Sequence, residues 1–141
     1  MYLTDEKVAV LGAAGAIGSN LAQTLLASQT ARCIAMYDPF EKGLEGAAEE
    51  LYHCAFPDAE VTWTPDIGEA LSGAAFVITS GGAPRREGMT REDLRRDNAQ
   101  IARQLGIDIR EHSPACKFVI VIFNPADITG LAVLVHSGLP P

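Results

Sequence analysis

Glycines follow the first apolar run of the chain, Lys7–Leu11, and are spaced as G-x-x-G-x-x-G. The loop consists of Gly12, Ala13, Ala14, Gly15, Ala16, Ile17 and Gly18. A tight turn at Gly12, a close backbone approach at Gly15 and close helix packing at Gly18 all require a residue without a side chain. Unpaired N–H groups at the start of the following helix favour an anion. We therefore predict that this loop binds the pyrophosphate of a dinucleotide; a glycine-rich turn without a ligand is the alternative.

An acidic residue stands at the distance at which such a site binds a ribose. Asp38 ends the second apolar run, twenty residues after Gly18. Its carboxylate can accept hydrogen bonds from the adenosine ribose hydroxyls and would repel a 2′-phosphate. Because no arginine follows at Pro39 or Phe40, the pattern favours NAD over NADP. The alternative for Asp38 is a turn residue before proline.

Arginines gather in one segment of an otherwise acidic chain. The formal net charge is −7, yet five of the eleven basic residues are arginines within twelve positions: Arg85, Arg86, Arg91, Arg95 and Arg96. The guanidinium group is suited to planar anions such as carboxylates. We expect Arg95 and Arg96 to lie on a solvated helix face, paired with Glu92 and nearby acids.

A glycine-rich stretch, Ser80–Gly82, leads through these arginines into a long helix. Thr90 and Asp93 form a capping-box pattern, which starts the helix near Arg91. Arg91 and Asn98 share one helical stripe with apolar residues. The apolar members of the stripe are Leu94, Ile101 and Leu105. A purely structural helix would be apolar at both polar positions, so we predict that Arg91 and Asn98 face a ligand.

Short apolar runs alternate with helical patterns along the chain. The expected strands are 7–11, 32–37, 61–64, 75–79 and 118–123, and the expected helices are 16–28, 43–54, 66–71, 91–111 and 126–136. This alternation predicts the α/β class with a doubly wound parallel sheet, the Rossmann dinucleotide-binding fold. Because that fold has six strands, the chain is expected to be truncated after the fifth strand and the helix that follows it. The last helix is apolar nearly all round, and we expect it to pack against further chain.

Composition and charge disfavour several classes of function. Hydrophobic residues make up 48% of the 141 residues and charged residues 21%, which is typical of one folded globular domain. The acidic net charge argues against nucleic-acid and membrane partners. The first residues show no pattern of a secretory signal and no apolar run is long enough to span a bilayer, so we expect neither. Cys33, Cys54 and Cys116 are scattered without C-x-x-C spacing, so we expect buried, inert thiols, no metal site and a cytoplasmic location.

From Lys7 to its last residue the chain resembles the malate and lactate dehydrogenases. The shared motifs are Val10–Gly18, Tyr37-Asp38, Pro84–Arg91 with Asn98, and Phe123–Asp127. The resemblance implies the NAD-binding domain of a malate dehydrogenase, an oxidoreductase of the tricarboxylic acid cycle that transfers a hydride between NAD and malate or oxaloacetate. It identifies residues 1–141 as that domain and implies a catalytic domain absent from this chain.

The same resemblance implies roles for individual residues. Arg85 stands where the family carries arginine for a dicarboxylate substrate and glutamine for lactate. Arg91 would be catalytic, polarising the keto oxygen of the substrate, and Asn124 would touch both substrate and nicotinamide. The implied cofactor contacts are Gly12, Ala13, Ala14, Gly15, Ala16, Ile17, Gly18, Asp38, Ser80, Gly81, Gly82, Asn98, Ile122 and Asn124.

The family's proton-donating histidine belongs to the second half of its members. His53, His112 and His136 lie within or at the ends of predicted helices rather than after a strand, so none is expected to be catalytic and the chain alone is expected to be inactive. Two alternatives stay open. Arg85 argues against a lactate-type dehydrogenase, and the missing sixth strand argues against a stand-alone NAD-binding or assembly module.

The second predicted helix carries a broad apolar face, and the family uses this region for contact between subunits. The face consists of Leu44, Ala47, Ala48, Leu51, Tyr52 and Ala55. The resemblance therefore implies a homo-oligomer, either a dimer or a tetramer. Ordinary packing of this face on the sheet is the alternative.

Overall fold

The computed structural model describes residues 1–141 and joins five parallel strands in one sheet. The strands are β1 (Val8–Leu11), β2 (Cys33–Tyr37), β3 (Glu60–Thr64), β4 (Phe76–Thr79) and β5 (Phe118–Val121). Their spatial order is β3-β2-β1-β4-β5, and every neighbouring pair is parallel. Val8 of the central strand is level with Ile34 of β2 and with Phe76 of β4. The order reverses at β1, and such a reversal creates a ligand crevice at the carboxyl ends of the strands.

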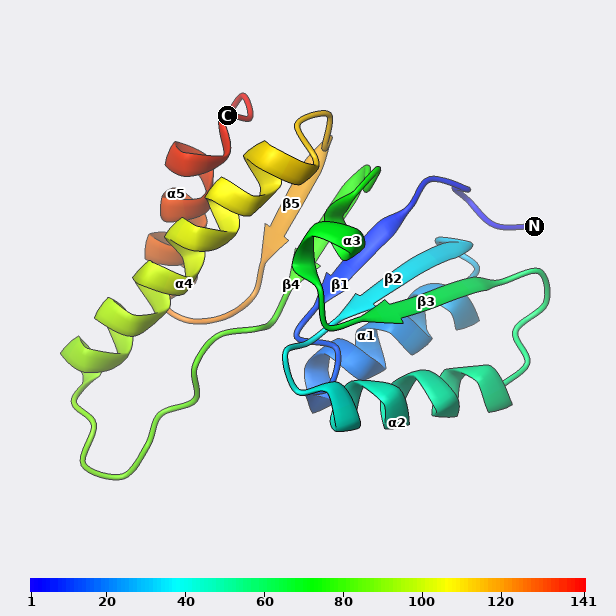
Figure 1. The fold of residues 1–141 in the computed structure, drawn as a ribbon, viewed down its shortest axis with the longest axis horizontal. Coiled ribbons are helices and arrows are strands. Elements are labelled where there is room, and N and C mark those ends of the chain that lie inside the picture. The colour runs from blue at the N-terminus through cyan, green and yellow to red at the C-terminus, as the bar shows by residue number, and fades with distance from the viewer.

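Helices cover both faces of the sheet (Figure 1). They are α1 (Ala16–Ala27), α2 (Glu41–His53), α3 (Ile67–Leu71), α4 (Arg91–His112) and α5 (Ala126–Ser137). Because successive strand residues point to opposite faces, Val8 and Val10 pack with α1 and α2 in one core cluster. Ala9 and Leu11 pack with α3, α4 and α5 in the other. The doubly wound parallel sheet expected from the sequence is confirmed. None of the helices combines the length and the apolar character needed to cross a membrane.

Several element ends differ from the sequence expectation by one or two residues. β5 ends at Val121 rather than at position 123, because its partner β4 already ends at Thr79. α2 begins at Glu41 rather than at position 43, whereas α5 begins at Ala126 as expected. Assigned helix boundaries commonly shift by one or two residues in this way.

The three cysteines lie in different environments. All are free thiols; Cys116 is buried as expected, whereas Cys33 is half-buried and Cys54 is exposed. Cys54 follows the end of α2 and lies off the stripe that packs on the sheet, which is why the expectation of burial is wrong for it. Burial raises the pKa of the Cys116 thiol, which keeps it in the unreactive, protonated form.

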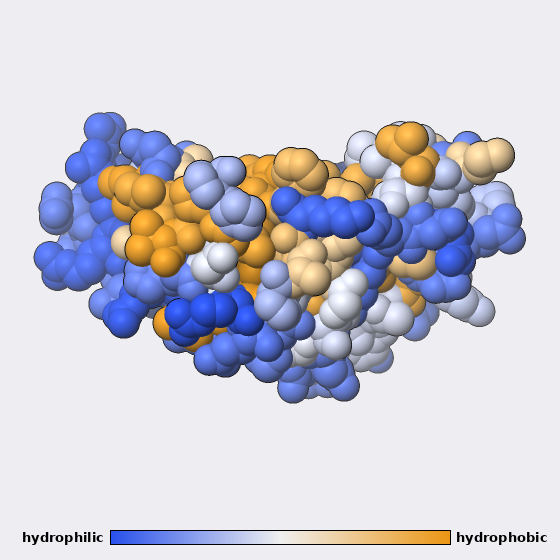
Figure 2. Space-filling model, turned by 90° about the horizontal axis from the view of Figure 1, so that it is seen from above, coloured by the Kyte–Doolittle hydropathy of each residue, from blue (hydrophilic) through white to orange (hydrophobic).

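The helices leave two apolar surfaces uncovered. On one face of β5, Phe118 is 67% exposed and Ile120 is 54% exposed, because α1 and α2 pack mainly on β1, β2 and β3. On α5, Ile128, Leu131 and Val135 are exposed. Figure 2 shows hydrophobic residues gathered in the middle of the molecule, with polar residues on both sides of them.

With these surfaces exposed, the chain is expected to self-associate as its concentration rises, because apolar patches beyond roughly a few hundred Å² seldom stay exposed on monomers. Light scattering over a concentration series measures this. The double substitution Leu131→Gln with Val135→Gln should weaken the association, whereas Ala27→Gln at an exposed position of α1 should not. A wild-type chain that stays monomeric at every concentration would contradict the expectation.

Candidate functional site

At the carboxyl edge of the sheet, the loop after β1 lies against the loop after β4. Gly12 has a φ of +83°, and a Cβ atom there would lie 2.8 Å from the Cα and N atoms of Gly81. The Ser80 N–H donates to the Leu11 carbonyl oxygen at 3.0 Å, which fixes the two strand ends to each other. Only glycine accommodates both the positive φ and the close approach. The tight turn expected at Gly12 is present.

α1 begins directly after this loop and presents free N–H groups. A Cβ atom on Gly18 would overlap the carbonyl oxygen of Gly12, so the helix packs against the loop as expected. The N–H groups of Ala16, Ile17 and Gly18 donate no hydrogen bonds to the backbone, and Gly15, Ala16 and Ile17 are exposed. The N-terminus of α1 can therefore bind an anion by donating hydrogen bonds to it.

Asp38 lies beside the same loop, at the end of β2. One of its carboxylate oxygens accepts a hydrogen bond from the Ala14 N–H at 3.1 Å, and the other accepts one from the Phe40 N–H at 2.9 Å. The Gly12 N–H also donates to the carbonyl oxygen of Tyr37, at 2.9 Å. The end of β2 and the glycine loop thus form one unit. Each Asp38 oxygen keeps a lone pair for a ribose hydroxyl, so its turn role and a ligand role are compatible.

A crevice of about 400 Å³ opens between the two halves of this edge. It is lined by Leu11, Gly12, Tyr37, Asp38, Pro39, Ile67, Thr79, Gly81, Gly82, Ile101, Gln104, Leu105 and Asp108. Burial raises the pKa of the Tyr37 phenol, and nearby carboxylates, Asp38 foremost, raise it further. Mostly apolar walls with a few polar groups are typical of a cofactor site.

The side chain of Asn98, on α4, links the loop after β4 to the loop after β5. Its side chain is nearly fully buried: Oδ1 accepts from the Ala83 N–H at 2.8 Å, and Nδ2 donates to the Asn124 carbonyl oxygen at 2.6 Å. A Cβ atom on Gly82 would lie 2.6 Å from the ring of Phe123, so these loops also touch directly. Asn98 faces inward as expected, and its partners in this structure are backbone groups of the chain itself.

The start of α4 carries the predicted capping box. The Asp93 N–H donates to the Thr90 hydroxyl oxygen at 3.1 Å, and the Thr90 N–H donates to the Asp93 carboxylate at 3.0 Å. The hydrogen bonds from Thr90 hold the pKa of Asp93 below its usual range. Arg91, next to the cap, is exposed and forms no ion pair, and Arg85 donates only to the Met89 carbonyl oxygen, at 3.4 Å. Both guanidinium groups are therefore free to meet an anion.

Two expectations for α4 are wrong. Arg91 does not share the inward face of Asn98, because the first turns of α4 extend beyond the sheet, where no other element covers them (Figure 1). Arg95 and Arg96 are exposed as expected, but neither forms an ion pair with Glu92 or any other acid.

The loop after β5 completes the edge. The Ile122 N–H donates to the Thr79 carbonyl oxygen at 2.9 Å, and the exposed Asn124 side chain forms no hydrogen bond within the chain. His53, His112 and His136 lie at the carboxyl ends of α2, α4 and α5. The His112 ring lies against Gly68 of α3, and none of the three histidines lines the crevice. No three His, Cys, Asp or Glu side chains are grouped as metal ligands.

The family described as lactate/malate dehydrogenase, NAD binding domain, matches residues 6–141. The chain belongs to this family. The match identifies an NAD-binding domain, and the glycine loop, Asp38 and the crevice lie together at one edge of it. The resemblance read from the sequence is confirmed.

Named relatives of this NAD-binding domain are malate dehydrogenases. The mitochondrial enzyme of Schizosaccharomyces pombe is 38% identical over 126 residues, covering 87% of this chain and 36% of the relative. The cytoplasmic enzyme of Saccharomyces cerevisiae is 37% identical, covering 86% and 36%. The apo structure of the Picrophilus torridus malate dehydrogenase superposes with a TM-score of 0.88 at 32% identity, covering 98% of this chain and 44% of that one. The chain therefore spans less than half the length of these relatives.

Sequence reasoning missed two polar residues that line the crevice of this domain, Gln104 and Asp108. They are four residues apart on a helix, a pattern that usually indicates a solvated surface. The available signal was their place on one stripe with Ile101 and Leu105, which continues the stripe recognised from Arg91 to Leu105.

A glycine exchange tests the packing of α1 on the loop. Gly18→Ala is expected to lower the free energy of unfolding by roughly 1–3 kcal/mol, because the added methyl group overlaps backbone. Gly46→Ala is the matched control: nothing lies within 4 Å of its added methyl group, so it should raise stability by up to about 1 kcal/mol. Urea unfolding measures both, and equal effects of the two variants would contradict the close approach.

Proposed function

We propose that this chain is the NAD-binding part of a malate dehydrogenase and takes part in hydride transfer between NAD and malate or oxaloacetate, a reaction of the tricarboxylic acid cycle. One observation supports the proposal above all: the glycine loop and Asp38 lie at the same crevice. Arg85 and Arg91, on the segment that follows β4, form no ion pair and can bind an anion. Residues 1–141 form one domain in this proposal, and the catalytic domain lies outside this sequence.

The chain's residues fit a dinucleotide along this edge. The free N–H groups of Ala16, Ile17 and Gly18 would hold the pyrophosphate, and Asp38 would accept hydrogen bonds from the adenosine ribose. A side chain at Gly12 would occupy the space where the loop after β1 meets the loop after β4. NAD, when bound, supplies the acceptor for a hydride. The remaining proposed contacts are Ala13, Ala14, Gly15, Ser80, Gly81, Gly82, Asn98, Ile122 and Asn124.

Two arginines would bind a dicarboxylate substrate. Arg91 is placed at the first position of α4 by the capping box, where its guanidinium can stabilise charge that develops on the keto oxygen. Arg85 lies on the glycine-containing loop and would neutralise the second carboxylate, whose burial without a counter-charge is costly. Asn124 would touch the substrate from the loop after β5. No histidine of this chain lines the crevice, so in this proposal the proton is exchanged with a group of the catalytic domain.

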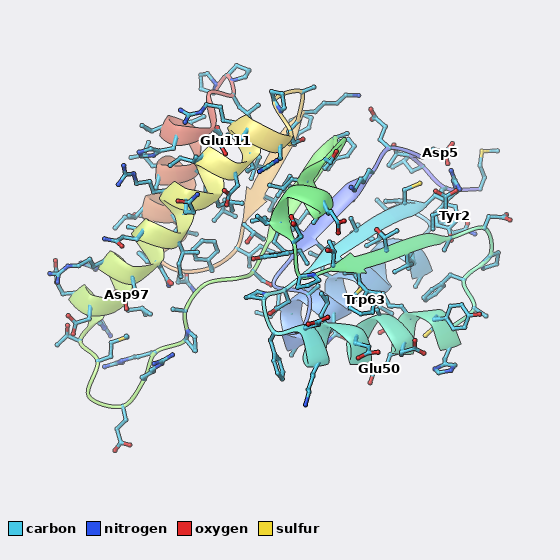
Figure 3. The ribbon with its side chains drawn as sticks, viewed as in Figure 1. Tyr2, Asp5, Glu50, Trp63, Asp97 and Glu111 are labelled. Carbon is cyan, nitrogen blue, oxygen red and sulfur yellow. The ribbon has the colours of Figure 1, made fainter.

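A homo-oligomer, dimer or tetramer, is part of the proposal. Leu44, Ala48 and Leu51 of α2 pack on the sheet, but Tyr52 is 79% exposed. It lines a groove of about 750 Å³ between α2 and β3 that also includes Trp63, which Figure 3 labels on β3. An apolar groove with exposed aromatic residues supports contact with a second copy. We place the protein in the cytoplasm, supported by its unpaired cysteines, with no nucleic-acid or membrane partner.

Calorimetric titration of the 141-residue chain is expected to show tighter binding of NAD than of NADP, because the Asp38 carboxylate repels a 2′-phosphate. Asp38→Asn should weaken NAD binding roughly ten-fold, which is the usual effect of losing a charged hydrogen bond. It should also reduce the ratio of the NAD affinity to the NADP affinity. Glu50→Gln, at an exposed position of α2 labelled in Figure 3, is the control and should change neither affinity. Equal affinities of the wild type for the two dinucleotides would remove the role given to Asp38.

Substrate choice can be measured in a chimera that continues this chain with the part of the Picrophilus torridus malate dehydrogenase that follows the matched region. Arg85→Gln should lower kcat/KM for oxaloacetate by roughly 10² to 10³, the cost of removing one partner of a buried charge pair, and should affect pyruvate less. Arg91→Gln should depress both substrates together. The 141-residue chain alone is expected to show no turnover, so it serves as the negative control for the chimera. An unchanged ratio of the two substrates in Arg85→Gln would remove the support for malate.

A further inference from the structure

The crevice continues past the glycine loop into a slot between α3 and α4. Ile67 at the start of α3 lies on one side, and Ile101 and Leu105 of α4 lie on the other. Pro39 and the ring of Tyr37 line the same space on the β2 side. Apolar walls of this kind suit a flat aromatic base, which is held by stacking and apolar contact rather than by charge.

The α4 side of the slot ends in a carboxylate. Ile101, Gln104, Leu105 and Asp108 follow one another at helical spacing, so they form a single stripe along the crevice. The Gln104 amide Nε2 donates to Asp108 Oδ1 at 3.0 Å. This hydrogen bond holds the half-buried carboxylate in place and leaves its second oxygen without a partner. No arginine, lysine or histidine pairs with Asp108.

The unpartnered carboxylate oxygen of Asp108 can only accept a hydrogen bond. An ionised aspartate has no donor, and the Gln104 amide donates to its other oxygen. The adenine base carries an exocyclic amino group, which is a donor, whereas hypoxanthine carries a carbonyl oxygen at that position. A carbonyl facing a carboxylate would leave both groups desolvated and repelling each other.

We infer that Asp108, held by Gln104, recognises the exocyclic amino group of the adenine base, so that the chain binds adenine dinucleotides and discriminates against hypoxanthine dinucleotides. This inference rests on the proposed binding of NAD in the crevice. It assigns to α4 a recognition of the base that is separate from the ribose contact of Asp38. If the hydrogen bond between Gln104 and Asp108 only stabilised α4, the chain would bind adenine and hypoxanthine dinucleotides equally well.

The test is calorimetric titration of the 141-residue chain with NAD and with nicotinamide hypoxanthine dinucleotide. The wild type is expected to bind NAD about ten-fold more tightly, because a charged hydrogen bond is exchanged for a repulsion. Asp108→Asn keeps the size of the side chain but offers an amide that can face either base, so the ratio should fall to about two-fold or less. Glu111→Gln removes an exposed charge one turn further along α4, outside the crevice, and should leave the ratio unchanged.

The outcomes separate this inference from the proposed function. Equal affinities in the wild type, or a ratio that Asp108→Asn leaves intact, would overturn the recognition by Asp108 while NAD binding itself stands. Binding of neither dinucleotide would overturn the proposed function and the inference with it. The wild-type comparison needs no substitution, so a variant that fails to fold still leaves the inference open to refutation.

Discussion

The contact between Gly12 and Gly81 sets the geometry of the whole carboxyl edge. Two loops that are far apart in the chain approach each other with backbone against backbone, at a separation that excludes even a methyl group. Gly18 presses α1 against the same turn, so the free N–H groups of α1 and the Asp38 carboxylate lie on either side of it. A side chain at Gly12 would push the loops apart and separate the helix end from the carboxylate. The positions of the charged and polar groups therefore depend on the absence of side chains beside them.

The site has a fixed part and a free part. Asp38 and Asn98 are both held by backbone groups, and every buried side-chain nitrogen or oxygen atom has a hydrogen-bond partner. Groups held in this way need little ordering when a ligand binds, which lowers the entropic cost of association. Arg85 and Arg91 have no comparable restraints. A preorganised cofactor side beside unrestrained cations suits a site in which the anionic substrate itself orders the arginines.

The sequence predicted what depends on local backbone chemistry and missed what depends on tertiary placement. The turn at Gly12, the packing at Gly18 and the Thr90 and Asp93 cap follow from conformational and capping preferences, and all are present. Arg91 was expected to face inward because helical spacing says which residues share a stripe but not how far the helix extends past its neighbours. Gln104 and Asp108 resemble a surface pair until α3 is known to lie opposite them. The partners of Asn98 come from two loops whose approach no local pattern encodes.

The strand order has a consequence for how the chain folds. β1, β2 and β3 are consecutive in the chain and pair with neighbours in sequence, whereas β1 meets β4 only across a long intervening segment, with Val8 level with Phe76. Closing that longer loop costs more conformational entropy, so the contacts between β1 and β4 form more slowly. The half-sheet of β1 to β3 can thus assemble while the remainder is still unfolded, and the crevice exists only after β4 docks. During synthesis from the N-terminus, binding competence is then acquired in a late step, so a bound dinucleotide would stabilise the joining of the two halves rather than either half alone.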